Sequence, residues 1–351
     1  MIESINLGSY PYTYVRTVTM KSKLFKKNDY DKLLKMEIHE LTKYLQETNY
    51  GIEINDLTGR YTGITLLEHA LTRNLIASFE KLKRISPDEL HALIEVYLKR
   101  NDVFNIKTII RAKFSGMSFD YSSPLLKSGV LFSHSQLQTL FSLEKIDLII
   151  ESLGFFDSKE KNSLLNDFHQ RNSLLVIENA LDKHYYAETF SFCASIKGGA
   201  DFFKAYLSTE IDVINLKLLL RLKKEGFTTT QILEHIFYFG RELKEYQLLL
   251  MLKKDYEHLI PYLLKHKHFG KLIREHHNQL LDKDLTLFEI GLERYLLQKA
   301  SLLLHQNPLS GEAILGFMLA KDIEVRNVTA LIKGKQLEID EHFLAEQLVV
   351  I

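Results

Sequence analysis

The sequence predicts an all-α protein built from three similar helical domains, and three observations support that prediction. Leu, Ile, Lys and Glu recur at spacings of three and four almost throughout the 351 residues, which is the period of helices that bury one face. Only five prolines and sixteen glycines interrupt the chain. Two short blocks of sequence each occur three times, roughly 110 residues apart.

The helical pattern can be followed in detail over residues 87–97. Leu90, Leu93, Ile94 and Tyr97 fall at i, i+3, i+4 and i+7, on one face of a helix. Ser86 is expected to be the N-cap, with Pro87 in the first turn. The Ser-, Pro- and Gly-rich residues 121–129 predict a loop instead.

The first repeated block is predicted to be a helix with a buried stripe. It reads DVFNIKTIIR at 102–111, DVINLKLLLR at 212–221 and EVRNVTALIK at 324–333. Four aliphatic residues of the first copy share the predicted core face: Val103, Ile106, Ile109 and Ile110. Phe104, Thr108 and Arg111 are expected to face the other way. The asparagines that repeat in register predict buried amides that tie two helices together: Asn105, Asn215 and Asn327.

The second block precedes the first at a nearly constant distance. It reads LEHALTRN at 67–74, IENALDKH at 177–184 and FEIGLERY at 288–295. Its glutamates are expected to form ion pairs or hydrogen bonds that fix how helices cross within each repeated unit, with contact to partners as the alternative: Glu68, Glu178 and Glu289. With Gly116 and Gly226 as helix-ending glycines, the repeat predicts domains at 1–116, 117–226 and 227–351.

Three similar domains that meet through one repeated contact can close around a pseudo-threefold axis, which would form a funnel. An open superhelix is the alternative, although it is more typical of much shorter repeats. The repeated cations are the candidate interface for partners: Arg111, Arg221 and Lys333, together with Arg73, Lys183 and Arg294 from the second block. Arg111, Arg221 and Lys333 could instead pair across domain boundaries, or lie on a solvated helix face with weak surface ion pairs.

Composition excludes several function classes. The 45 basic and 45 acidic residues cancel, so no global field favours nucleic acid or an anionic membrane. No apolar run approaches the roughly 20 residues of a spanning helix, so contact with a membrane is expected only through a partner. The start of the chain shows no secretory signal pattern, and Cys193 as the single cysteine fits a reducing compartment.

The sequence carries no motif for catalysis or for a cofactor. The phosphate-binding and dinucleotide-binding glycine patterns, GxSxG, HExxH and paired cysteines are all absent from it. Five histidines invite a metal-site hypothesis, but their spacing and lack of acidic or thiol companions favour a polar surface: His258, His266, His268, His276 and His277. Cys193, even with His184 nearby, is expected to be a core residue, and Gly198 and Gly199 a turn between helices.

The chain resembles the C subunits of archaeal-type (A/V-type) ATP synthases, which are the counterparts of the d subunits of vacuolar ATPases. The resemblance rests on SYPYTYVRTVTMKSKLF at 9–25, on LLEHALTRNL followed by RISPDEL at 84–90, and on YLKRNDVFNIKTIIRAKFSGMS at 97–118. It implies a three-domain funnel without a nucleotide site or cofactor, used in ATP synthesis and hydrogen-ion transport.

The resemblance further implies a rotor part at the cytoplasmic face of the membrane, one copy per complex. Its partners would be the central-stalk subunits of D and F type and the membrane proteolipid ring. Two readings from other classes stay open at this point. One is a free-standing helical scaffold for soluble partners, and the other is an enzyme whose site shows no familiar motif.

Overall fold

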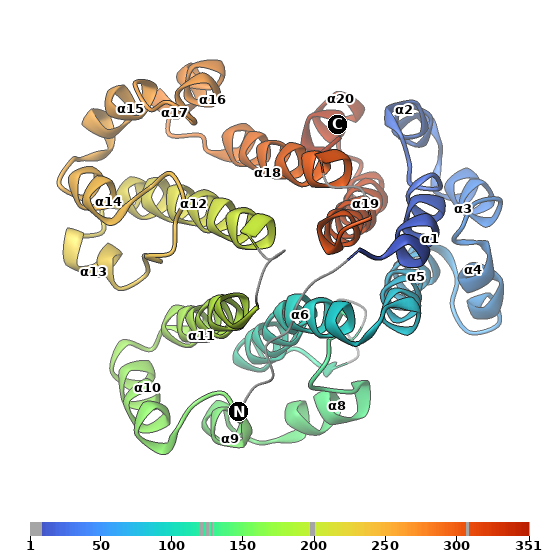
Figure 1. Ribbon diagram of the computed structural model, residues 1–351, viewed down its shortest axis with the longest axis horizontal. Coiled ribbons are helices and arrows are strands. Elements are labelled where there is room, and N and C mark those ends of the chain that lie inside the picture. The colour runs from blue at the N-terminus through green and yellow to red at the C-terminus, as the bar shows by residue number, and fades with distance from the viewer. Residues whose placement is uncertain are drawn as a thin grey trace. The chain divides into compact units, whose positions relative to one another are not determined.

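The computed structural model describes residues 9–119, 123, 126–127, 129–196, 201–306 and 309–350, without the side chains of residues 202, 301–306 and 312. Within these residues the regular structure is helical, which confirms the all-α prediction (Figure 1). The predicted loop at 121–129 lies partly outside the described residues, and Gly198 and Gly199 lie wholly outside them.

The chain divides into two compact units, each made of two stretches of sequence. The first comprises the described residues within 1–15 and 42–199, with helices α4 (Gly51–Leu57), α5 (Gly63–Ile85), α6 (Asp88–Phe114), α8 (His134–Ser142), α9 (Ile146–Ser152), α10 (Ser158–Arg171) and α11 (Leu174–Ser195). Two helices, α1 (Pro11–Lys21) and α3 (Ile38–Gln46), begin in one unit and end in the other.

The second unit comprises the described residues within 16–41 and 200–351. Its helices are α2 (Lys27–Lys35), α12 (Asp201–Lys224), α13 (Thr229–Leu233), α14 (Glu245–Leu252), α15 (Tyr256–Leu264), α16 (Gly270–Glu275), α17 (His277–Leu281), α18 (Thr286–Gln306), α19 (Gly311–Gln336) and α20 (Glu341–Gln347). The division of the sequence into three domains at 116 and 226 stays a prediction.

Helix α6 carries the first copy of the block DVFNIKTIIR. Its four predicted core residues are at most 5% exposed, as expected. The expectations for the start of this helix, Ser86 as N-cap and Pro87 in the first turn, were wrong. The helix begins at Asp88 after Pro87, whereas Ser86 ends α5 and donates its hydroxyl to the carbonyl of Leu82 (2.7 Å). Thr108, opposite the apolar stripe, is also buried, because α6 packs against α5, α8, α9 and α11 and so has little solvated face.

The three helices that carry the repeated block end in the same way. Two residues after α6, α12 and α19 the backbone turns left-handed, with φ of 67° at Gly116, 78° at Gly226 and 53° at Glu338. The following amide then donates to a carbonyl five residues earlier in each copy: Met117 to Ala112 (2.8 Å), Phe227 to Leu222 (2.9 Å) and Ile339 to Gly334 (2.9 Å). The sequence repeat is therefore also a structural repeat.

The repeated asparagine ties its helix to a loop. In each copy the side-chain amide donates to the carbonyl, and accepts from the N–H, of the residue 22 positions later, at 2.7 to 3.0 Å. The pairs are Asn105 with Lys127, Asn215 with Phe237, and Asn327 with Val349. The prediction of buried amides is confirmed, but the prediction that they join two helices was wrong.

An acidic residue three positions before the asparagine holds the next part of that loop. Asp102 accepts hydrogen bonds from the backbone N–H groups of Val130, Leu131 and Phe132, and Asp212 from those of Arg241, Glu242 and Leu243. The loop comes so close that a Cβ at Gly129 or Gly240 would lie 1.9 or 2.3 Å from a carboxylate oxygen. Glycine is required at both positions for space.

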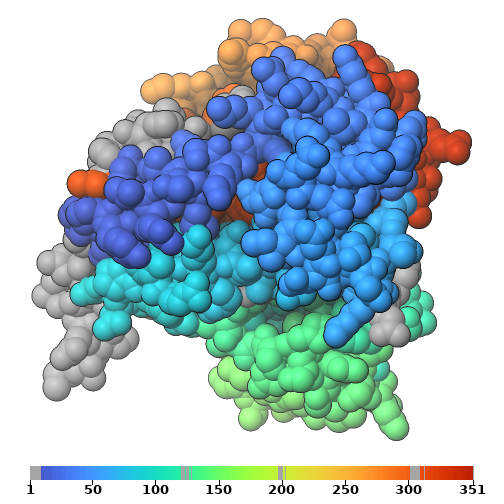
Figure 2. All heavy atoms as spheres, turned by 90° about the vertical axis from the view of Figure 1, so that its right-hand side faces the viewer, coloured from blue at the N-terminus to red at the C-terminus, as the bar shows by residue number. Residues whose placement is uncertain are grey.

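Segments from opposite ends of the sequence meet in the second unit. The N–H of Phe25 donates to Glu324, 299 residues later, at 2.5 Å. The ammonium of Lys335 donates to the carbonyl of Leu34 (2.5 Å), and α2 packs against α20. Figure 2 shows the blue N-terminal segment beside the red C-terminal helices.

Candidate functional site

Four charged side chains from α6 and α11 form a ladder of ion pairs in the first unit. Arg111 donates two hydrogen bonds to Glu178, each 2.6 Å long. One helical turn earlier, Lys107 donates to both oxygens of Asp182 (2.7 and 2.8 Å). The paired fork of guanidinium and carboxylate fixes angle as well as distance, so this ladder sets how the two helices cross.

The second unit rebuilds this ladder between α12 and α18. Arg221 donates two hydrogen bonds to Glu289, and Lys217 donates to Glu293 (2.9 Å). The residues are the repeat equivalents of those in the first ladder. The prediction that Glu178 and Glu289 form ion pairs is confirmed, but the prediction that these pairs lie within one repeated unit was wrong, because each pair joins one copy of the repeat to the next.

Part of the ladder was missed in the sequence although its signal was present. Lys107 and Lys217 are in register inside the first block, and Asp182 and Glu293 stand four residues after the glutamates of the second block. Within each block the charged residues are spaced four apart, so they lie on one face of the helix. This spacing in both blocks indicates that the cations of one helix can pair with the carboxylates of the other.

The other predicted interface cations lie in separate settings. Arg73 bonds to Asp56 (3.3 Å) with both side chains about half exposed, and Lys183 is exposed on α11. Lys333 is half-buried on α19. Arg294 donates to the carbonyls of Glu346 (2.8 Å) and Leu348 (3.0 and 3.3 Å), which fixes the C-terminal segment to α18. Arg111 and Arg221 remain 55% and 59% exposed despite their partners.

The two ladders differ in their electrostatics. Burial raises the pKa of Asp182 above its ordinary value, because Lys107 only partly offsets the cost of desolvation. Burial also acts to raise the pKa of Glu293, but there Arg326 (3.1 Å) and Lys217 together outweigh it, so its pKa is lowered. The lowered pKa of Glu293 therefore depends on Arg326, which is both close and hydrogen-bonded to it.

This difference predicts an acid-sensitive second unit. Since the folded-state pKa of Glu293 lies below its ordinary value of 4.5, Glu293 contributes stability above that pH, and the contribution is lost as the pH falls through the lower folded-state pKa. In Arg326→Ala the folded-state pKa of Glu293 should lie closer to its ordinary value. The free energy of unfolding of this variant should therefore fall less between pH 6 and pH 3 than that of the native protein. Urea unfolding at several pH values would test this, with the exposed Lys271→Ala as control. An unchanged pH slope in Arg326→Ala would contradict it.

The five histidines occupy different environments. His258 bonds to Asp255 (2.6 Å), and His268 to Glu242 (2.9 Å). His266 accepts from the backbone N–H groups of His268 and Phe269 (3.3 and 3.4 Å). Over the part of the chain that the structure describes, no group of three or more His, Cys, Asp or Glu side chains is arranged to hold a metal ion. Cys193 is buried, as expected of a core residue.

None of the described helices combines the length and the apolar character needed to span a membrane. This finding agrees with the scattered charges along α6, α12 and α19.

Comparison with known proteins gives a consistent result. The family model described as "ATP synthase (C/AC39) subunit" matches residues 14–347. The C subunit of the A-type ATP synthase of Methanosarcina acetivorans is 34% identical over 346 residues, covering 98% of this chain and 94% of its own. The corresponding A-type C subunit of Haloquadratum walsbyi is 30% identical over 346 residues, covering 97% and 98%. The resemblance noted in the sequence is confirmed: the chain belongs to the family of ATP synthase (C/AC39) subunits.

Proposed function

We propose that this chain is the C subunit of an A-type ATP synthase, a non-catalytic socket that couples the central stalk to the membrane proteolipid ring. The observation that carries the proposal is similarity over nearly the full length of chains that bear that name. In this role the protein holds no nucleotide and transmits torque between ATP turnover and ion transport.

The repeated ion-pair ladder supports the finer architecture. Ladders of equivalent residues join the first copy of the repeat to the second and the second to the third. A contact repeated between successive modules is what a constant rotation produces, and a rotation of about a third of a turn closes after three steps. We therefore propose three domains, 1–116, 117–226 and 227–351, around a pseudo-threefold axis that forms a funnel.

The proposed partners are the D- and F-type stalk subunits on one side and the proteolipid ring on the other, with one copy of this chain per complex. The chain would lie at the cytoplasmic face as a peripheral protein that touches the membrane only through the ring. The exposed parts of Arg111 and Arg221 support a polar grip on the stalk, because polar interfaces hold register and still permit release.

Removal of the protein from the complex tests the main role. Without it, ATP hydrolysis by the soluble head should continue while ion pumping by the same preparation is lost. ATPase assays and ion-uptake assays on reconstituted vesicles, with and without the purified protein added back, would measure both. Ion transport that stays coupled to hydrolysis in its absence would refute the socket.

A charge swap separates structural from partner use of the ladder. In Arg111→Glu with Glu178→Arg, the pair is rebuilt in reverse, so the free energy of unfolding should change by only about 1 kcal/mol. If Arg111 also contacts the stalk, the affinity for purified stalk subunits should fall about tenfold, the usual scale for a lost charged contact. The matched control is the swap Lys271→Glu with Glu275→Lys, an exposed ion pair outside the candidate interface. Unchanged stalk affinity would remove Arg111 from the interface.

A further inference from the structure

The acidic residue of the repeated block is followed by the same capped helix in the first two copies. In the first, Phe132 donates its N–H to Asp102 (3.3 Å), and the next residue, Ser133, is the N-cap of α8 and donates to Gln136 (2.9 Å). In the second, the equivalent hydrogen bonds run from Leu243 to Asp212 (3.0 Å) and from the N-cap Lys244 of α14 to Gln247 (3.0 Å).

The buried positions of these two helices also agree. Counted from the N-cap, the fourth and seventh residues are buried in both copies: Leu137 and Leu140 in α8, and Leu248 and Met251 in α14. The element therefore has three features in a fixed order along the chain. A backbone N–H donates to the acidic residue, the next residue is an N-cap that donates to the third residue of the helix, and the fourth and seventh residues after the N-cap are buried.

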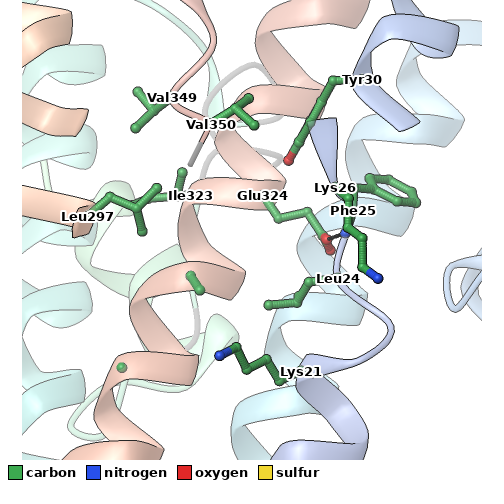
Figure 3. Close-up of a pocket in the computed structure, with 12 residues that line it drawn as sticks. Lys21, Leu24, Phe25, Lys26, Tyr30, Leu297, Ile323, Glu324, Val349 and Val350 are labelled. Atoms are coloured by element: carbon green, nitrogen blue, oxygen red, sulfur yellow. Dashed lines mark hydrogen bonds between the residues drawn. The ribbon is translucent and has the colours of Figure 1, made fainter. Parts of the chain in front are cut away.

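In the third copy the same element comes from the other end of the sequence. Glu324 stands at the position of Asp102 and accepts the N–H of Phe25 (2.5 Å; Figure 3). The next residue, Lys26, is the N-cap of α2 and donates its N–H to Asp29 (2.8 Å). The fourth and seventh residues after Lys26 are buried, namely Tyr30 and Leu33.

We propose that the third module is circularly permuted: residues 24–35, the N-terminal strap, supply the capped helix that the first two modules draw from the sequence directly after their own acidic residue. The strap is part of the module of α18, α19 and α20, although its Phe25 is 299 residues away from Glu324 of α19. The match in order, caps and buried positions carries the proposal, and a chance contact would not reproduce all of them.

The permutation makes the strap the point at which this module can open. In the other two modules the element continues directly from the loop that the asparagine holds, whereas the strap docks from the far end of the sequence. A cavity of about 250 Å³ lies along it, lined by strap residues and by α18, α19 and the C-terminal segment: Leu24, Phe25, Tyr30, Leu297, Ile323 and Val349 (Figure 3). Along this cavity the strap lacks packed neighbours among the described residues, and fewer contacts lower the local free energy of opening.

Hydrogen exchange on the full-length protein tests the proposal. Leu33→Ala should speed exchange in α19 and α20 about tenfold or more, and leave α4 and α5 unchanged although they follow the strap in sequence. Leu140→Ala, at the equivalent position of α8 in the first module, should instead speed exchange in α6 and leave α19 and α20 unchanged. Asp31→Ala, on the exposed side of α2, is the matched control and should have no effect.

Two outcomes would overturn the assignment. One is faster exchange in α4 and α5 with α19 and α20 unaffected, which would make the strap part of the first unit. The other is no regional effect of Leu33→Ala at all. If Leu33→Ala fails to fold, Leu33→Val makes the same comparison with a smaller cavity and the same expected regional pattern.

Discussion

Glu324→Gln is expected to lower the free energy of unfolding by about 3–5 kcal/mol. Glu324 and Lys321 form an ion pair of 2.8 Å in which the two side chains are only 3% and 2% exposed. Removing the carboxylate charge leaves the buried ammonium without this counter-charge, and the cost of desolvating it is then no longer offset. Urea denaturation of the full chain at neutral pH would measure the loss.

The double variant Lys321→Met with Glu324→Gln is the control. It removes both charges, so the stability should recover most of what the single variant loses, because a buried pair contributes little net stability over apolar side chains of similar volume. A single Glu324→Gln variant that unfolds within about 1 kcal/mol of the native protein would show that water or other polar groups satisfy Lys321.

Asn215→Ala is expected to lower the free energy of unfolding by about 2–6 kcal/mol. Its amide is fully buried and is bonded to both the N–H (2.9 Å) and the carbonyl (2.7 Å) of Phe237. Truncation leaves two buried backbone groups unsatisfied, and each of these costs about 1–3 kcal/mol. Asn105→Ala should cost less, because its partner Lys127 is half-buried and water can replace the lost hydrogen bonds.

Asn215→Asp provides the control for this comparison. The carboxylate keeps an acceptor for the N–H of Phe237 and loses the donor to its carbonyl, so its cost should exceed that of Asn105→Ala and include the cost of burying a charge. Equal costs for Asn105→Ala and Asn215→Ala in thermal and urea unfolding would contradict the role assigned to burial.

The sequence predicted the core face of α6 correctly, but it did not predict that Thr108, opposite that face, would also be buried. Periodicity assigns one apolar stripe to a helix, but it does not show how many neighbours surround that helix. Because α6 packs on several sides, even polar residues outside the stripe are buried. Sequence also identified Arg111 and Arg221 as equivalent, yet the helical period alone could not pair them with Glu178 and Glu289.

The sequence by itself determined the helical class, the residues that repeat, the glycines that end α6 and α12, and membership of the family. These follow from local periodicity, from backbone conformation and from residues kept in register, which are all properties of short stretches of chain. Only the tertiary structure decided which groups the repeated residues bind. Asn105 holds a loop, and Phe25 reaches Glu324 across 299 residues. Such pairings depend on where distant segments meet in space, and a helical period carries no information about that.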